Sequence, residues 1–144
     1  MRVQIPSIGV DSALMALGLH DDGSLEVPPD AFPAGWYTGA PTPGQLGPSI
    51  ITGHVRVDGR QGVFADLHNL KPGHEITVSR SDRRMVVFRV ERVEEFPKEK
   101  FPTTVVYGDI DHAGLRLITC GDRRSGRYQS NVVVFAELVK VRTS

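Results

Sequence analysis

Short runs that alternate between apolar and polar residues dominate this chain, and they predict strands more often than helices. The clearest alternation covers residues 75–79, and a longer β-rich run at 85–93 follows it after a Ser-Asp turn. The two runs together predict a hairpin. Residues 3–10 are predicted as an edge strand, because Pro6 interrupts them and cannot donate a hydrogen bond to a sheet.

Three further apolar segments predict buried strands, and two of them end at a reactive side chain. Residues 49–54 end at His54, and residues 115–120 end at Cys120. The most apolar segment, 131–141, follows a loop of small and basic residues. Residues 12–19 are apolar without a clear period, so they fit either a strand or a short helix.

Helical patterns are few. Phe64, Leu67 and Leu70 recur at helical spacing and predict a short helix or turn, which a Lys-Pro-Gly sequence ends. The connections at 41–48 and 96–106 contain prolines and are predicted as loops. About eight short strands separated by turn residues, with no internal repeat, indicate an all-β barrel or sandwich.

Composition narrows the class without identifying a function. The chain has 144 residues, of which 40% are hydrophobic and 24% charged, so we expect one soluble globular domain spanning residues 1–144. Its formal net charge of zero does not favour nucleic acid or an anionic membrane as a partner. No apolar run approaches the length of a transmembrane helix. A single cysteine excludes a disulfide within the chain.

Cys120 and His54 form the first candidate for chemistry, since strand ends on a shared barrel rim are where loops build sites. A cysteine and a histidine suffice for covalent acyl transfer: the thiolate attacks a carbonyl, and the imidazole returns a proton to the leaving amine. Gly53 allows the close backbone approach that a site wall requires. A lone cysteine is equally compatible with a small buried apolar residue, and His54 with a hydrogen-bonded strand end.

The basic loop after Cys120 contains Arg123, Arg124 and Arg127. Positive charge beside a thiol favours the thiolate, and a guanidinium can hold a developing oxyanion. Solvated loop charges are the alternative, and we favour it for Arg124. The other histidines are scattered and the aspartates lack calcium-loop spacing, so we expect no metal site and no cofactor.

Several motifs resemble those of sortases, the cysteine transpeptidases of Gram-positive bacteria, in their order and spacing. Thr52-Gly53-His54, Leu117-Ile118-Thr119-Cys120 and the strand 131–136 are the core of this resemblance, which covers nearly the whole of 3–141. Within the class D/E/F group of sortases, the actinobacterial class F is the most similar. Four further motifs indicate this class: residues 5–10, Gly35-Trp36-Tyr37, 63–67 and 106–109.

The resemblance implies an eight-stranded β-barrel with one or two short helices, an N-terminal membrane anchor preceding these residues, and an extracytoplasmic site. It implies that Cys120 is the nucleophile and His54 the acid/base. The thiolate would cleave an LPxTG-type sorting signal between Thr and Gly. An amine, often of the peptidoglycan cross-bridge, or water would then resolve the acyl-enzyme. The activity would anchor surface proteins to the cell wall. Ile118, Thr119 and Asn131 flank the nucleophile, and we expect them to bind substrate.

The catalytic arginine is where this sequence departs from the family. Sortases place it on the strand after the cysteine, but here Gln129 and Asn131 occupy the same-face positions. Arg127 is the nearest arginine on that face, and Arg123 resembles the end of a longer class F loop. We predict Arg127 for the oxyanion and substrate-positioning role, with Arg123 as the alternative.

Two other functions remain open from the sequence. An L,D-transpeptidase is also a cysteine enzyme of the cell wall. The residues just before its cysteine are of Ser/His-Gly type, whereas here Thr119 precedes Cys120. A catalytically degenerate β-barrel binding module is the second alternative, and the displaced arginine is its main support.

Overall fold

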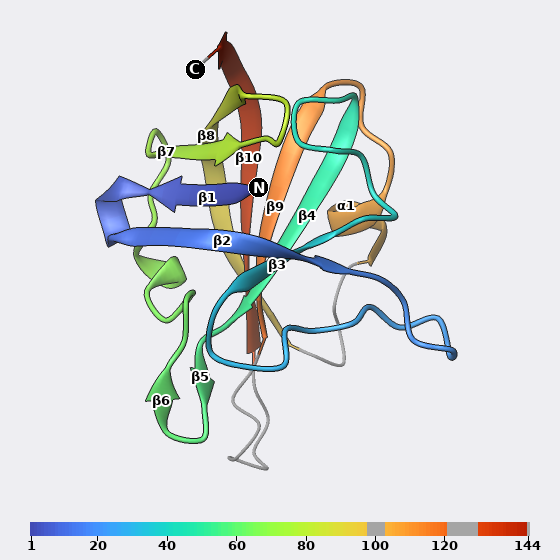
Figure 1. The fold of residues 1–144 in the computed structure, drawn as a ribbon, viewed down its shortest axis with the longest axis vertical. Helices are drawn as coiled ribbons and strands as arrows, with labels where there is room; N and C mark the ends of the chain where they lie inside the picture. Colours follow the sequence, from blue (N-terminus) through green and yellow to red (C-terminus); the bar gives the residue numbers. More distant parts are fainter. Residues whose placement is uncertain (98–102, 121–129, 144) are drawn as a thin grey trace.

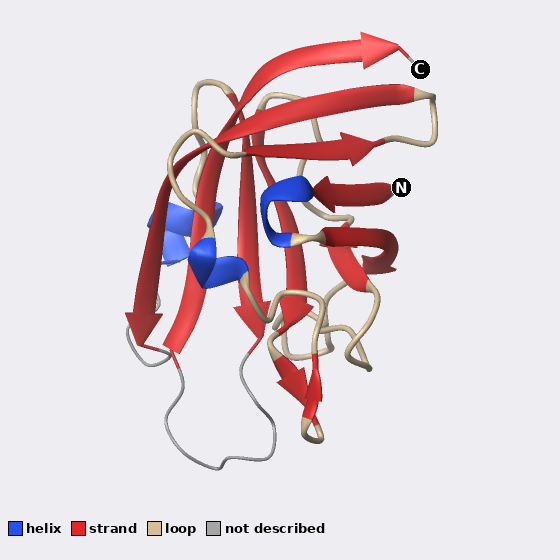
Figure 2. Ribbon diagram, turned by 90° about the vertical axis from the view of Figure 1, so that its left-hand side faces the viewer, coloured by secondary structure: helices blue, strands red, loops and turns tan. Residues whose placement is uncertain are grey.

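The computed structural model describes residues 1–97, 103–120 and 130–143. Eight of its strands close into a barrel in the order β1-β2-β3-β4-β9-β10-β8-β7, and β5 and β6 form a separate small hairpin. The longest strands of the barrel, β10 and β8, run side by side (Figures 1 and 2). The predicted eight-stranded all-β barrel with very few helices is therefore confirmed.

Pro6 divides the first predicted strand instead of placing it at an edge. β1 (Arg2–Ile5) ends before it, the 3₁₀ turn η1 (Pro6–Ile8) begins with it, and β2 (Val10–Leu17) follows. β1 pairs with both β2 and β7, so the edge prediction is wrong. A barrel has no edges, and Pro6 is tolerated because it lies just outside the ladder. Gly9 closes the turn with a φ of 70°, a left-handed conformation that suits glycine.

β3 and β4 begin the wall that carries the candidate site. β3 (Ala34–Tyr37) pairs in parallel with β2 and antiparallel with β4 (Gly47–His54). All eight residues of β4 are buried, which agrees with the predicted buried strand ending at His54. Beyond it, the two-residue strands β5 (Arg56–Val57) and β6 (Arg60–Gln61) pair with each other in an antiparallel hairpin.

The middle of the chain follows the predictions closely. The predicted short helix or turn at 63–70 is the 3₁₀ turn η2 (Leu67–Asn69). β7 (Glu75–Ser79) and β8 (Arg84–Pro97) form the predicted antiparallel hairpin. Within the predicted loop at 96–106, the helix α1 (Thr103–Tyr107) begins instead, and it lies outside the barrel beside β4 (Figure 1).

β9 (Ala113–Cys120) and β10 (Ser130–Thr143) complete the barrel. β9 runs parallel to β4 on one side and antiparallel to β10 on the other. Alternate side chains of a strand face opposite sides of the sheet. The inward set joins the main core inside the barrel, which includes Ile51, Leu117 and Val134. The outward set packs in a second cluster: Ile50, Val106, Ile118, Val133 and Phe135.

Candidate active site

The two predicted catalytic residues occupy one register position at the ends of neighbouring strands. In the parallel ladder of β4 and β9, His54 is the Cα partner of Cys120. The pairing extends over eight residues from Gly47 and Ala113, so the register of both strand ends is fixed along their whole length. Two segments far apart in the sequence therefore bring these two residues together at the rim of the barrel, as predicted.

His54 is held in a buried position with one ring nitrogen bonded and the other free. The side chain is 2% exposed, and Nε2 lies 2.6 Å from the carbonyl oxygen of Pro28. Nδ1 is buried and has no hydrogen-bond partner among the described residues. A carbonyl oxygen can only accept, so Nε2 must carry a proton. In the neutral ring Nδ1 then holds the lone pair, and it is the nitrogen available for proton transfer.

Glycines allow the chain to close tightly around His54. A Cβ on Gly53 would lie 2.6 Å from Cγ1 of Val63, and a Cβ on Gly62 would collide with the carbonyl oxygen of His54. The space is occupied because the segment after β6 folds back, and the amide of Phe64 donates to the His54 carbonyl at 3.0 Å. The close approach expected at Gly53 is present, and Gly62 adds a second one.

Of the three residues predicted to bind substrate, two face the same side as His54. Ile118 belongs to the outward cluster. Asn131 alternates with the outward residues Val133 and Phe135, and its Oδ1 is buried without a described partner. Thr119 lies on the opposite face of β9, where its Oγ1 accepts from the Val132 amide at 2.8 Å. The structure therefore groups Ile118 and Asn131 with His54 and gives Thr119 a bracing contact between β9 and β10.

Arg116 is a feature of this face that the sequence showed only as an interruption of an apolar run. It is 6% exposed, the one buried arginine in the described part of the chain, and its Nε has no partner there. Its guanidinium carbon lies 4.7 Å from the ring centroid of Phe135, while Arg92 stacks on that ring at 3.9 Å. Burial lowers the pKa of Arg116, and the neighbouring charge of Arg92 adds to this. A buried cation paired mainly with an aromatic ring is rarely retained for stability alone.

Arg116 cannot take the oxyanion role predicted for an arginine. It precedes Cys120 by four positions on β9, a separation of about 13 Å along an extended strand. Oxyanion donors must come within hydrogen-bond distance of the reacting carbonyl. Both predicted candidates, Arg127 and Arg123, lie outside the described residues.

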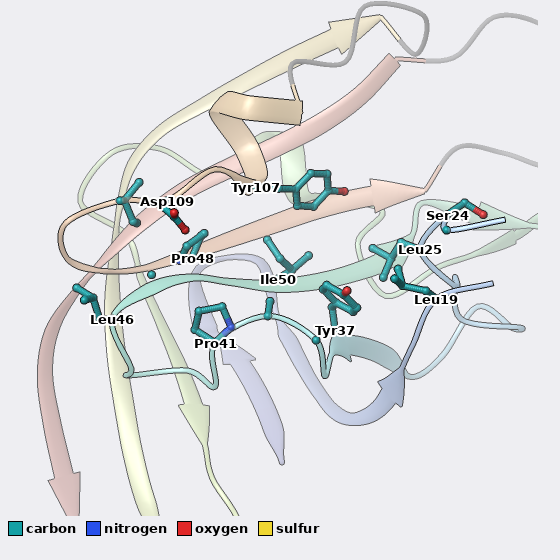
Figure 3. A pocket seen from close by; sticks show the side chains of 15 residues that line it. Leu19, Ser24, Leu25, Tyr37, Pro41, Leu46, Pro48, Ile50, Tyr107 and Asp109 are labelled. Carbon is teal, nitrogen blue, oxygen red and sulfur yellow. The ribbon is translucent and has the colours of Figure 1, made fainter. Parts of the chain in front are cut away.

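A groove lies along the outer side of the first half of β4, and His54 at the end of that strand is not one of its lining residues. Its volume is about 920 Å³, and Figure 3 shows side chains entering it from the β2–β3 connection, from β4 and from the α1 region. Ile50 and Pro48 supply its floor, and they share the outward face of β4 with His54 by strand alternation. The walls are largely apolar; they include Leu19, Leu25, Tyr37, Leu46 and Tyr107, with Asp109 as an acidic residue.

The described residues contain no group of three or more histidine, cysteine, aspartate or glutamate side chains that could hold a metal ion. Among these residues there is also no helix of the length and apolarity needed to cross a membrane.

Comparison with known proteins gives a consistent result. The profile described as the sortase domain matches residues 3–139. Sortase A of Listeria monocytogenes is 18% identical, with a TM-score of 0.73 over 99% of this chain and 88% of that one. A threonine-to-valine variant of Streptomyces avermitilis sortase E is 17% identical, with a TM-score of 0.74 over 99% and 88%. Sortase C of Streptococcus pneumoniae is 19% identical, with a TM-score of 0.72 over 99% and 67%. No curated protein matches the chain.

Proposed function

The chain belongs to the sortase family, whose members are cysteine transpeptidases, and we propose that it catalyses this reaction with Cys120 as nucleophile and His54 as acid/base. The register pairing of His54 with Cys120 carries the proposal. It puts the two residue types needed for covalent acyl transfer at adjacent strand ends, and a groove runs along the same outer face of β4 up to Ile50, four residues before His54.

The proposed reaction has two steps. The thiolate of Cys120 attacks the carbonyl carbon of the scissile peptide bond, and the protonated ring of His54 gives its proton to the departing amine. The product is a thioester on Cys120. An incoming amine or water then attacks the thioester, gives a proton to His54 and releases the thiolate. The unpartnered Nδ1 of His54 is the atom that supports this exchange, because it alone on the ring is not already bonded to protein.

The groove supports a peptide substrate of the LPxTG type, cleaved between Thr and Gly. Ile50 on its floor precedes His54 by four residues on the same face of β4. An extended peptide spans about 3.3 Å per residue, so a chain with its reacting carbonyl at His54 reaches Ile50 about four residues away. The apolar walls suit the Leu-Pro end of such a signal. Ile118 and Asn131 would contact the segment in between.

The remaining assignments follow the sequence resemblance. Motifs within residues 5–10 and 106–109 favour the actinobacterial class F over the other classes. Residues 1–144 would be the catalytic domain, anchored to the membrane by a preceding segment and acting outside the cytoplasm. The acceptor would be an amine of peptidoglycan in a Gram-positive cell wall. Arg127, or Arg123 in its place, would stabilise the oxyanion.

Mass spectrometry of the intact protein tests the central claim. Incubation with a panel of LPxTG-type peptides should add the mass of the acyl fragment to the wild-type chain, and Cys120→Ala should show neither adduct nor cleavage. A Ser81→Ala variant, changed in the exposed β7–β8 turn at the opposite end of the barrel from Cys120, is the matched control and should form the adduct. Robust turnover by Cys120→Ala would refute the assignment. An adduct with peptidoglycan stem peptides alone would favour an L,D-transpeptidase activity, and no adduct with any peptide would favour a binding module.

A further inference from the structure

A short segment between β2 and β3 covers His54 and takes part in its geometry. We call Pro28–Ala31 the strap. Pro28 is buried, and its carbonyl oxygen lies 2.6 Å from Nε2 of His54. Pro28 and Ala31 at the two ends of the strap are buried, while Pro29 and Asp30 between them are exposed. The contact joins main chain to side chain across 26 positions of sequence.

We propose that the strap is the positioning element of the catalytic histidine: the Pro28 carbonyl fixes the proton on Nε2 and directs Nδ1 toward the reacting groups. The argument rests on the proposed role of His54. An acceptor-only partner on one ring nitrogen leaves a single tautomer, and it also fixes the rotation of the ring. Orienting partners of this kind usually are carboxylates or main-chain carbonyls.

The strap is hydrogen-bonded to residues 60–64, the segment that also packs against His54. Nη2 of Arg60 donates to Oδ1 of Asp30 at 2.6 Å, and that oxygen also accepts from the Ala31 amide at 2.7 Å. The Val63 amide donates to the Ala31 carbonyl at 3.0 Å, and the next residue donates to the carbonyl of His54. One segment, residues 60–64, thus holds both the strap and the main chain of the histidine in a common frame.

Charge supports the same arrangement. Asp30 lies close enough to His54 for their charges to interact, and Arg60 is the cation paired with Asp30. The pKa of Asp30 is lowered chiefly by the Ala31 amide and then by Arg60, with His54 contributing less. Asp30 therefore stays ionised at neutral pH and remains an acceptor for both of its partners. Two consecutive prolines before it restrict the backbone, so the Pro28 carbonyl has little freedom to turn away.

Nuclear magnetic resonance of ¹⁵N-histidine-labelled protein reads the ring directly. The His54 signal is assigned by its loss in His54→Gln, and spectra are taken of the neutral ring. We expect one neutral tautomer with the proton on Nε2, and a ring N–H that exchanges slowly enough to be observed. Exposed His20 in the same spectrum is the internal control and should show no such proton. A His54 proton on Nδ1, or a ring N–H in fast exchange, would overturn the proposal.

Loosening the strap should change turnover more than binding. Asp30→Ala removes the acceptor for Arg60 and for Ala31, and we expect kcat to fall about tenfold with KM nearly unchanged, because misplacement of a catalytic group acts on the chemical step. The slow ring proton should be lost with it. Asp30→Asn keeps an acceptor for the Ala31 amide and should retain most of kcat.

Asp11→Ala breaks a comparable surface ion pair with Arg2, and it should leave kcat and the ring signal unchanged. An Asp30→Ala variant with wild-type kcat and an intact ring proton would refute the role of the strap. If the wild-type protein acts on no peptide tested, the proposed function fails for those substrates, and the ring signal still decides whether the carbonyl fixes the tautomer.

Discussion

The inner and outer faces of β4, β9 and β10 are both buried, but they carry different kinds of side chain. On the inner face, residues such as Ile51, Leu117 and Val134 pack into the barrel core, and the polar side chain of Thr119 is hydrogen-bonded to the main chain. On the outer face the same strands carry His54, Arg116 and Asn131 among apolar neighbours. One set of strands therefore supplies a packed interior on one side and a polar, enclosed surface on the other.

The two faces differ more in how many of their buried polar atoms lack hydrogen-bond partners than in how deeply they are buried. Three buried side-chain atoms in the described part of the chain lack partners, His54 Nδ1, Arg116 Nε and Asn131 Oδ1, and all three belong to outward residues. A buried polar atom without a partner costs about 1–3 kcal/mol. Among the described residues this energetic cost falls on the outer face alone, which indicates that the outer face is suited to binding and chemistry. The inner face contributes the packing that stabilises the fold.

The largest expected effect comes from removing His54, the proposed proton-transfer group of the outer face. His54→Gln should lower kcat/KM for an LPxTG-type peptide by about a thousandfold, since general acid–base catalysis contributes roughly 10²–10⁴-fold. Steady-state peptide cleavage measures this loss, and thermal unfolding checks that the variant is folded. His20→Gln, at an exposed position, should keep wild-type activity. Equal activity in both variants would remove His54 from the mechanism.

On the inner face the expected effect is on stability alone. Leu117 is fully buried in the barrel core, and Leu117→Ala should lower the free energy of unfolding by about 3 kcal/mol, since truncation of a core leucine leaves a cavity. Urea titration measures the change. Leu46→Ala, at a side chain that is 70% exposed, should change it by less than about 0.5 kcal/mol. A comparably small change for Leu117→Ala would contradict the division between the faces.

The smallest effect has the opposite sign. Arg116→Met should raise the free energy of unfolding by about 1 kcal/mol, because replacing a buried charge with an apolar side chain of similar length is often stabilising. The same urea titration measures it. Arg92→Met is the control: Arg92 stacks on the same Phe135 ring but is 43% exposed as a side chain, so little change is expected. Destabilisation by Arg116→Met would show that the buried guanidinium is held by strong interactions.

Much of the fold could be predicted from the sequence because its signals are local. The alternation at 75–79 and 85–93 predicted the β7–β8 hairpin, and the apolar run at 49–54 predicted β4. β3 was missed because its four residues are too short to show a period, and its pairing with β2 is parallel and non-local. Pro6 was misplaced at an edge because the rule for proline in strands does not anticipate a turn between two paired strands.

The candidate site was predictable in part for the same reason. Cys120 and His54 could be selected because each ends an apolar strand, and a barrel brings strand ends to its rims. The Pro28 carbonyl could not be found in this way, since every residue has a main-chain carbonyl and the sequence does not mark which one will face a ring nitrogen. Arg116 stood in the sequence as a break in a hydrophobic run, and only its packing against Phe135 shows it as buried.

The parallel pairing of β4 with β9 would make the proposed activity a late product of folding. The hydrogen bond from Thr52 to the Ile118 carbonyl connects residues 66 positions apart, and the intervening chain includes the barrel strands β7 and β8. Contacts of such long range form slowly, because the entropy of closing the loop is lost before the contacts reward it. A chain still emerging during synthesis, or one with β9 detached, has both the thiol and the imidazole but not their proximity. Closure of the barrel thus acts as the step that switches the site on.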